Sequence, residues 1–520
     1  MIKKHLLGGA LLVSVLVLLT GCKEMMSSLD NPVSAYFEVT PTQATIAKNQ
    51  TCQISYSTIS DGKVTFKSSA ENIATVDANG LVTAKTAGTA IITVELAATP
   101  YYQGATKNVE ISVDAVLSID ATEVTVGYGA SINLVKDYHL ARKGDATINY
   151  EIIEGGEFIT LDETTKDITG KACGNAKVKV SVPASVTASS DELIIDVKVR
   201  VQDFDQLKDA IASGDEVTAL LDDNVEIALS EVLDLKDKKI TIKGNDEKPA
   251  TIAVSSGAYF KTRNAFKLQN VIVDGSNMDM DFVQVGGASE APSAWTDLGT
   301  FVFENVKVNF LKKALIKSIQ KKYAYDLTVN NCIIQVSANV TVFDFSGSDT
   351  GNIVKTFTID GSTIYGSKSV TKQLYSSQSG YKVTELGSSE KQTFAISNST
   401  FYNLTYKANF FNHRQSNQTF FIYDVKSNIF VNCGKKGQTI KGLNQGSSGT
   451  NPTWIISGNV FNHDDGTDTM GDTHEDESTG DAEEPVTGSI AGVVSFADAA
   501  NGDFHQTLAQ VGDPRWRPEN

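Results

Sequence analysis

The sequence predicts an all-β chain in which two β-sandwich domains precede a right-handed parallel β-helix with an N-terminal capping helix. Residues 32–201 alternate apolar and polar positions between turns that contain Gly and Asn, which is typical of half-buried strands. From residue 202 onward a strand-and-turn phrase recurs about every 31 residues. A strand-rich repeat of this length indicates a solenoid of stacked coils. The repeat lacks long runs of helical periodicity, which argues against a helical solenoid.

The N-terminal residues predict export and anchorage. Residues 1–21 combine two lysines with an apolar run that is too short to span a membrane comfortably, and they are predicted to be a lipoprotein signal peptide. The run ends in Leu-Thr-Gly-Cys, which resembles a bacterial lipobox and implies a lipid on Cys22 that anchors the chain to a membrane. Residues 22–31 are predicted to be a tether, and Lys23-Glu24 loosely resembles the export signal of Bacteroidetes surface lipoproteins. The alternative is an ordinary secretory signal with an unmodified Cys22.

Composition limits the partners of the chain. The formal net charge of −17 disfavours nucleic acid. We expect no cofactor and no metal site. The acidic insertion near 463–485 suggests Ca²⁺, but it lacks the D-x-D-x-D-G order that gives Ca²⁺ ligands a defined geometry. Such a density of carboxylates is more typical of a solvated insertion.

Residues 32–114 form the first predicted sandwich. Between Val64 and Val94, strands alternate with tight turns at Asn79-Gly80 and Gly88. This stretch, with its ATVD, GLVTA and ITV segments, resembles the bacterial immunoglobulin-like group 2 domain. A weaker copy of the same pattern predicts a second, related sandwich over residues 115–201. Such modules usually act as spacers.

The predicted β-helix covers residues 202–520, and its repeated phrase places a turn-forming residue before a strand. These residues are Asn270, Asn305, Asn331, Gly361, Asn398, Ser427 and Gly458. A further copy is predicted around Lys239. Asn, Gly and Ser suit a corner that needs left-handed backbone geometry or a local side-chain hydrogen bond. An amphipathic helix at 204–211 is predicted to cap the first coil.

Several of these features occur together in a known group of proteins. The lipobox, the group 2 domain, the helix-capped β-helix and the segments Gly-Asp-Phe (502–504) and Gly-Asp-Pro-Arg-Trp (512–516) resemble uncharacterised Bacteroidetes lipoproteins. Those proteins have pectate-lyase-like β-helices and accompany polysaccharide-utilisation loci. The resemblance implies an outer-membrane location facing the cell exterior, near glycan uptake proteins. It implies a carbohydrate setting and no particular reaction.

One face of the predicted β-helix carries a column of polar side chains. Alignment of the strand that precedes each corner phrase places these residues outward on successive coils: Lys261, Gln284, Lys317, Asp344, Tyr375, Asn412 and Lys441. The next outward column contains Arg263, Ser346, Ser377 and Arg414. Because coils stack about 4.8 Å apart, we expect a ladder that suits an extended polysaccharide, with Arg as a clamp for uronic acid carboxylates. A solvated solenoid face would have a similar composition.

Three functions are compatible with this face. The first is a surface protein that binds an acidic polysaccharide, such as a pectin-like or other uronic-acid glycan, without cleaving it. The second is a polysaccharide lyase acting by β-elimination, in which His413, Arg414 and Lys441 would supply the base and neutralise the substrate carboxylate. The column contains a single acid, Asp344, and therefore offers neither a multi-carboxylate Ca²⁺ site nor the carboxylate pair of a hydrolase. The third is a structural or adhesive rod.

Overall fold

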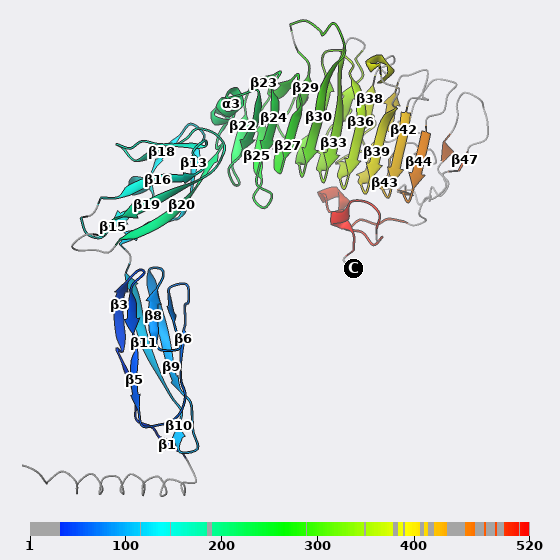
Figure 1. Ribbon diagram of the computed structural model, residues 1–520. Helices are drawn as coiled ribbons and strands as arrows, with labels where there is room; N and C mark the ends of the chain where they lie inside the picture. The colour runs from blue at the N-terminus through cyan, green and yellow to red at the C-terminus, as the bar shows by residue number, and fades with distance from the viewer. Residues whose placement is uncertain are drawn as a thin grey trace, which may run out of the picture.

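The computed structural model describes most of the chain between residues 32 and 518 (Figure 1). The described residues are 32–114, 116–145, 147–184, 190–287, 289–347, 350–377, 383–387, 391–405, 410–413, 421–433, 453–462, 473–474, 484–485, 493–508 and 510–518. The predicted signal peptide, Cys22 and the tether lie outside them, as does most of the acidic insertion. In the described part of the chain, no helix is both long and apolar enough to cross a membrane.

The first β-sandwich pairs a four-stranded sheet of order β3-β11-β9-β6 with a three-stranded sheet of order β4-β8-β7. Its strands are β1 (Val33–Ser34), β2 (Phe37–Thr40), β3 (Gln43–Ala47), β4 (Thr51–Gln53), β5 (Ser55–Thr58), β6 (Val64–Ser68), β7 (Ala74–Val76), β8 (Leu81–Ala84), β9 (Gly88–Leu96), β10 (Tyr102–Gln103) and β11 (Ala105–Asp114). Alternate apolar residues such as Ile92 and Val94 form the core between the sheets.

The second sandwich repeats this strand order, with sheets β13-β20-β19-β16 and β14-β18-β17. Its elements are β12 (Leu117–Ser118), β13 (Glu123–Gly127), β14 (Ser131–Asn133), α2 (Leu134–Asp137), β15 (Ala141–Arg142), β16 (Asn149–Glu154), β17 (Ile159–Leu161), β18 (Asp167–Gly170), β19 (Gly174–Val182) and β20 (Asp191–Arg200). Strands β17 to β19 take the places of β7 to β9 in the strand order. This equivalence accounts for the repeat seen in the sequence.

A buried carboxylate joins the two sandwiches. Asp191 accepts hydrogen bonds from the backbone N–H groups of Val116 (3.1 Å) and Leu117 (3.0 Å) in the second sandwich. Lys48 of the first sandwich donates to the same carboxylate at 2.9 Å and to the carbonyl of Glu192 at 2.8 Å. Burial raises the pKa of Asp191, but the Leu117 N–H and the Lys48 ammonium outweigh burial and lower it below its usual value.

Three parallel sheets make up the rest of the fold, and we call them sheets A, B and C. Sheet A contains β21 (Glu216–Leu220), β24 (Lys239–Lys243), β27 (Phe266–Gln269), β30 (Thr296–Glu304), β33 (Tyr323–Asn330), β36 (Ile353–Asp360), β39 (Gln392–Ser397), β42 (Phe421–Lys426) and β44 (Thr453–Ser457). Sheet B contains β22 (Glu226–Leu229), β25 (Ala250–Val254), β28 (Val271–Asp274), β31 (Lys307–Leu311), β34 (Ile333–Val336), β37 (Thr363–Gly366), β40 (Thr400–Tyr402), β43 (Ile429–Val431) and β45 (Val460–Asn462). Sheet C contains β23 (Val232–Lys236), β26 (Tyr259–Thr262), β29 (Val283–Val285), β32 (Ile316–Ser318), β35 (Phe343–Phe345), β38 (Tyr375–Ser377) and β41 (Phe411–His413).

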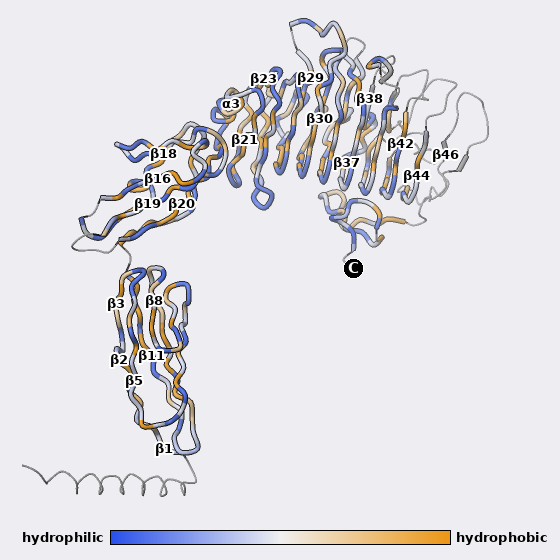
Figure 2. The backbone as a smooth tube through the Cα atoms, viewed as in Figure 1, coloured by the Kyte–Doolittle hydropathy of each residue, from blue (hydrophilic) through white to orange (hydrophobic). Residues whose placement is uncertain are grey.

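From β21 to β43 successive strands enter sheets A, B and C in rotation, and each strand up to β40 pairs with the strand three places further along the chain. At the end, β42 pairs with β44 and β43 with β45. This is a parallel β-helix, as the sequence predicts. Hydrophobic and hydrophilic residues alternate along its strands (Figure 2), and the inward ones form one continuous core. Helix α3 (Phe204–Ala212) covers the first coil with its buried residues Phe204, Leu207 and Ile211. Its N-terminus is capped by Asp203, whose carboxylate accepts a 2.8 Å hydrogen bond from the N–H of Gln206.

The corners between sheets A and B are formed by the predicted residues. All seven have positive φ angles, from +47° at Asn398 to +65° at Gly458. The predicted eighth copy is out of register, because Lys239 begins β24 and the corner of that coil follows Lys243.

The residue after each corner points inward, and in the later coils it is polar and fully buried. Ser362 Oγ accepts from the N–H of Cys332 (3.0 Å), and Ser399 Oγ accepts from that of Ser362 (3.1 Å). Asn428 Oδ1 then accepts from the N–H of Ser399 (2.9 Å), and Asn459 Oδ1 from that of Asn428 (2.9 Å). This internal ladder pairs backbone donors that would otherwise be buried without a partner.

A C-terminal segment, residues 493–518, packs on the outer face of sheet B. It contains the short 3₁₀ helices η3 (Ala499–Asn501) and η4 (Pro514–Trp516). The buried Asp513 accepts a 2.6 Å hydrogen bond from Thr363, and its N–H donates to Thr400 Oγ1 at 3.0 Å. Arg515 donates to the carbonyls of Cys332 (2.8 Å) and Gly361 (3.1 Å).

Asp191 is predicted to give the sandwich junction a pH-dependent stability. The substitution Asp191→Asn removes the carboxylate that binds Lys48, and we expect the free energy of unfolding to fall by about 1–3 kcal/mol at pH 7. Because folding lowers the pKa of Asp191, its contribution is fully present above the unfolded value of about 3.9. It is lost as the pH falls through the folded value. Denaturant unfolding in steps from pH 7 to about pH 2 measures this, with the exposed Asp196→Asn of β20 as control. A pH-independent difference would contradict the prediction.

The internal ladder is predicted to be most sensitive at Asn428. In Asn428→Ala the buried N–H of Ser399 loses its acceptor and the carbonyl of Ile396 loses the Asn428 amide donor, so we expect a loss of about 2–4 kcal/mol in unfolding free energy. The control is Thr358→Ala, a half-exposed residue of sheet A, for which we expect a change within about 0.5 kcal/mol. Urea unfolding followed by circular dichroism measures both variants. Equal effects would show that the ladder contributes nothing specific.

Candidate functional site

The predicted ladder lies on the outer face of sheet C, where strand pairing fixes which side chains share a column. The paired residues on successive coils are Asp234, Lys261, Gln284, Lys317, Asp344, Ser376 and Asn412. We call this column the polar row. It contains five of the seven predicted residues, adds Asp234 and Ser376, and differs from the prediction at Tyr375. Lys441, like Arg414, lies outside the described residues.

The predicted outward position of Tyr375 is wrong. Tyr375 pairs with Phe343 and Phe411, is fully buried and packs against the ring of Phe394. Leu374 and Tyr375 are both apolar enough to occupy the inward position of the repeat. The sequence alignment assigned that position to Leu374, which placed Tyr375 outward. A slip of one residue reverses every side chain of a strand, so Ser376, and not Tyr375, belongs to the column of Asp344 and Asn412. Ser376 and Ser377, which was predicted outward, are both buried.

The first cations of the face are bound to carboxylates. Lys261 Nζ lies 2.8 Å from Asp234 Oδ2. Arg263 binds Asp237 at 3.0 Å and lies 3.7 Å from Asp234. Burial raises the pKa of Asp234, but its hydrogen bond from Lys261 and its other partners outweigh burial and lower it. The exposed fractions of the Lys261 and Arg263 side chains are 22% and 12%. Part of the cover is the chain at Gly287, where a Cβ atom would lie 2.8 Å from Lys261 Cδ.

The middle of the polar row is more open. Lys317 has an exposed side-chain fraction of 40% and lies between Asp281 (3.6 Å) and Asp344 (3.7 Å). Ser346 donates its hydroxyl to Asp344 Oδ1 at 2.6 Å. Asp281 also accepts the N–H of Ala314 at 3.1 Å. The hydrogen bonds orient the two carboxylates, and Lys317 has the most exposed side chain among the cations Lys261, Arg263 and Lys317.

The far end of the face is described only in part. Asn412 follows Ser376 in the polar row and is largely buried. His413 ends β41, and the structure describes its backbone only. Since Arg414 and Lys441 are outside the described residues, the lyase constellation stays a prediction. Within the described part of the chain, no three or more His, Cys, Asp or Glu residues form a group that could hold a metal ion.

The charges of the described face nearly cancel. Its three cations, Lys261, Arg263 and Lys317, each lie within 4 Å of at least one carboxylate. The carboxylates involved are Asp234, Asp237, Asp281 and Asp344. Sequence alignment found only Asp344, because Asp234 lies one coil before the aligned phrases and the other two lie in turns. The face therefore offers alternating hydrogen-bond donors and acceptors rather than a free positive groove.

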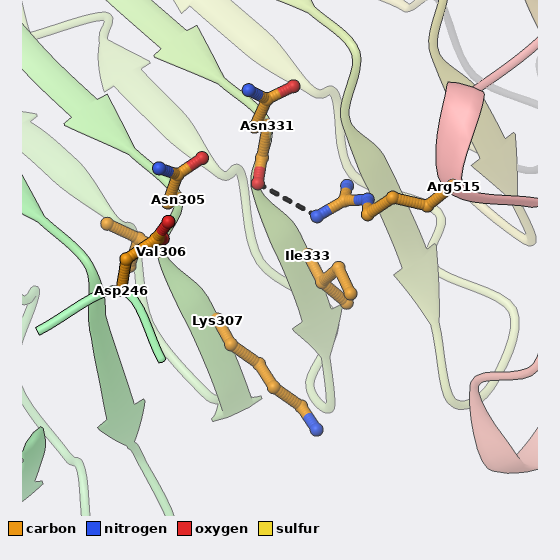
Figure 3. Close-up of a pocket in the computed structure, with 7 residues that line it drawn as sticks. All are labelled: Asp246, Asn305, Val306, Lys307, Asn331, Ile333 and Arg515. Atoms are coloured by element: carbon orange, nitrogen blue, oxygen red, sulfur yellow. Dashed lines mark hydrogen bonds between the residues drawn. The ribbon is translucent and has the colours of Figure 1, made fainter. Parts of the chain in front are cut away.

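A second polar surface lies where the C-terminal segment meets the corners between sheets A and B. A hollow of about 390 Å³ is lined by Asp246, Asn305, Val306, Lys307, Asn331, Ile333 and Arg515 (Figure 3). Arg515 reaches across and donates to the backbone carbonyl of Asn331 at 2.8 Å. The Asn305 amide donates to Asn270 Oδ1 at 2.9 Å on the coil before it. The sequence identified both Asn residues as corners but gave no signal for the hollow, because Arg515 arrives from a distant segment.

Comparison with known families identifies the first sandwich. Residues 35–99 match the family model of the bacterial Ig-like domain (group 2). The match confirms the immunoglobulin-like character predicted for this domain and does not extend to the β-helix. No curated protein sequence matches the chain.

Solved structures resemble limited parts of the chain. Domains 4 and 5 of the S-layer protein SbsC are 17% identical over 32% of this chain and 99% of that one, with a TM-score of 0.14. A SusE-like surface-located polysaccharide-binding protein from the Bacteroides thetaiotaomicron heparin utilisation locus is 14% identical over 32% of this chain and 34% of that one, with a TM-score of 0.19. Drosophila N-cadherin EC1-3 is 12% identical over 33% and 68%, with a TM-score of 0.15. At these TM-scores the likenesses carry no argument about function.

Proposed function

We propose that this chain is a cell-surface protein that binds an extended polysaccharide along sheet C, with Lys317, the more exposed lysine of the polar row, as the main contact. The supporting observation is the polar row itself. It repeats donors and acceptors at the spacing of stacked coils, about 4.8 Å. Gln284, Ser376 and Asn412 are buried, so the row is accessible at its charged members. Ion pairs and hydrogen bonds hold its side chains in place, so little side-chain entropy is lost on binding.

The charges of the row favour a hydroxyl-rich chain over a polyuronate. Sugar hydroxyls both donate and accept hydrogen bonds, and they can bind next to an ammonium and a carboxylate at once. A uronic acid would meet Asp281 and Asp344 beside Lys317, and like charges at short range oppose binding. The preference for acidic glycans expected from the sequence assumed free cations. We therefore propose that neutral polysaccharides bind at least as tightly as acidic ones.

The proposed setting is the outer membrane, with a lipid on Cys22 and the two sandwiches as spacers. In this arrangement the β-helix presents sheet C to glycans outside the cell, beside proteins that take them up. The setting follows from the lipobox and the family resemblance of the sequence. It can be tested by metabolic labelling of Cys22 with a fatty acid and by protease accessibility on intact cells.

Binding of polysaccharides to the purified chain tests the proposal. Affinity electrophoresis against neutral and uronic-acid polysaccharides is expected to show retardation, followed by calorimetry on the best ligand. Loss of a charged hydrogen bond in Lys317→Ala is expected to weaken binding about tenfold. The control is Lys426→Ala, because Lys426 is also paired, to Asp424 at 2.8 Å, but lies on sheet A. No retardation by any polysaccharide, or equal losses in the two variants, would overturn the proposal. Growth of unsaturated-uronide absorbance would instead indicate the lyase.

A further inference from the structure

Phe310 is an exposed aromatic residue at the end of β31, where sheet B turns towards sheet C. Its exposed fraction is 45%. The register between β31 and β34 shifts between Val308 and Leu311. Asn309 and Phe310 therefore form a bulge in β31, opposite a single residue of β34 on the next coil. Bulges re-aim side chains and often occur beside functional sites.

The backbone of Phe310 is strained as well as bulged. Its φ angle is +58°, in the left-handed region that bulky L-residues rarely adopt. No other Phe, Tyr or Trp of the described residues has a positive φ angle. Two effects therefore lower the folding stability at this position: the strained backbone, and the exposure of a large apolar side chain to water.

Neighbouring coils hold this conformation in place. The N–H of Gly275 on the coil before donates to the carbonyl of Asn309 at 2.9 Å. A Cβ atom at Gly275 would lie only 2.7 Å from the carbonyl oxygen of Phe310, so this close approach needs glycine. On the coil after, Gln335 accepts the N–H of Phe310 at 3.3 Å. Contacts on both sides thus fix the backbone and leave the ring outside.

The position of Phe310 relates it to the open part of the polar row. Residues 275–282 and 312–315 are stacked connections from sheet B to sheet C. They are joined by the hydrogen bond from Ala314 to Asp281, and Asp281 in turn pairs with Lys317. The first connection exposes Met280, at 37%, directly before Asp281. Phe310 and Leu311 end β31, the second connection follows, and Lys317 is the second residue of β32 beyond it.

We propose that Phe310 is the stacking platform for one pyranose ring of the polysaccharide that the polar row binds. This inference rests on the proposed function. The C–H face of a sugar ring packs on an aromatic face, while the hydroxyls at the ring edge remain free for polar partners. Lys317 and its carboxylates supply those partners on sheet C, across the connection that follows β31. A rigid aromatic side chain loses little conformational entropy on binding.

The test is the variant Phe310→Asn in the full chain. Asn occupies the same backbone region at Asn270, Asn305 and Asn331. We therefore expect Phe310→Asn to raise the melting temperature while it weakens polysaccharide binding about tenfold. Phe310→Trp keeps an aromatic face and is expected to retain the affinity of the wild-type chain. The control is Ile455→Ala, which removes an exposed apolar residue from sheet A and is expected to leave affinity unchanged.

The outcomes separate this inference from the proposed function. A lower melting temperature for Phe310→Asn would mean that the ring stabilises the fold, which overturns the platform without reference to any ligand. If Lys317→Ala weakens binding but Phe310→Asn does not, only the platform is wrong. If the wild-type chain binds no polysaccharide, the proposed function and the platform are both wrong. Higher stability together with weaker binding supports the platform.

Discussion

The structure of the β-helix depends on how seven of its coils turn from sheet A to sheet B at a single residue with a positive φ angle. That turn requires left-handed backbone geometry, which Asn and Gly adopt at the least cost. It also sends the next residue into the core, where its N–H needs a partner. In the later coils this N–H donates to the side chain of the corresponding residue on the next coil. The resulting ladder of hydrogen bonds runs from Cys332 to Asn459. Corner and ladder together fix the register, and the register decides which outward side chains form columns.

With the register fixed, the residues on the outer faces of sheets B and C change from coil to coil along the axis of the β-helix. They change where other parts of the chain cover these faces. On sheet B the first outward column changes from Lys307 and Ile333 to Thr363 and Thr400 where the C-terminal segment packs. The two threonine hydroxyls bind Asp513, so the covered coils have a surface shaped for the segment. On sheet C the polar row is partly closed at Lys261 and open at Lys317. A solenoid with uniform coils thus acquires a limited accessible site.

The sequence predicts the features that repeat and misses those that do not. The seven corner residues can be recognised because the same backbone geometry recurs in seven consecutive coils, and all seven have positive φ angles. The group 2 domain is visible for the same reason, since its turns and buried strands follow a shared pattern. Tyr375 is misplaced because two adjacent apolar residues satisfy one inward position, and the alternation of a short strand cannot choose between them. Asp237 and Asp281 are missed because they lie in turns whose lengths vary from coil to coil. The lipid on Cys22 and the roles of Arg414 and Lys441 stay predictions, because these residues lie outside the described part of the chain.

Departures from the repeat therefore carry more functional information than the repeat itself. The ion pairs of the polar row stabilise side-chain positions, but a solvated face can also contain such pairs at little energetic cost. Phe310 is different, because strain and exposure both oppose folding and neither is relieved within the described structure. The close approach of Gly275 and the hydrogen bond to Gln335 hold the backbone of Phe310 in this conformation despite its cost in folding stability. Since each coil contacts mainly its neighbours, a local loss of this kind stays local and leaves the register of the other coils unchanged. The fold can accordingly maintain one strained, exposed ring at the end of β31 without weakening the column that positions Lys317 on the next strand.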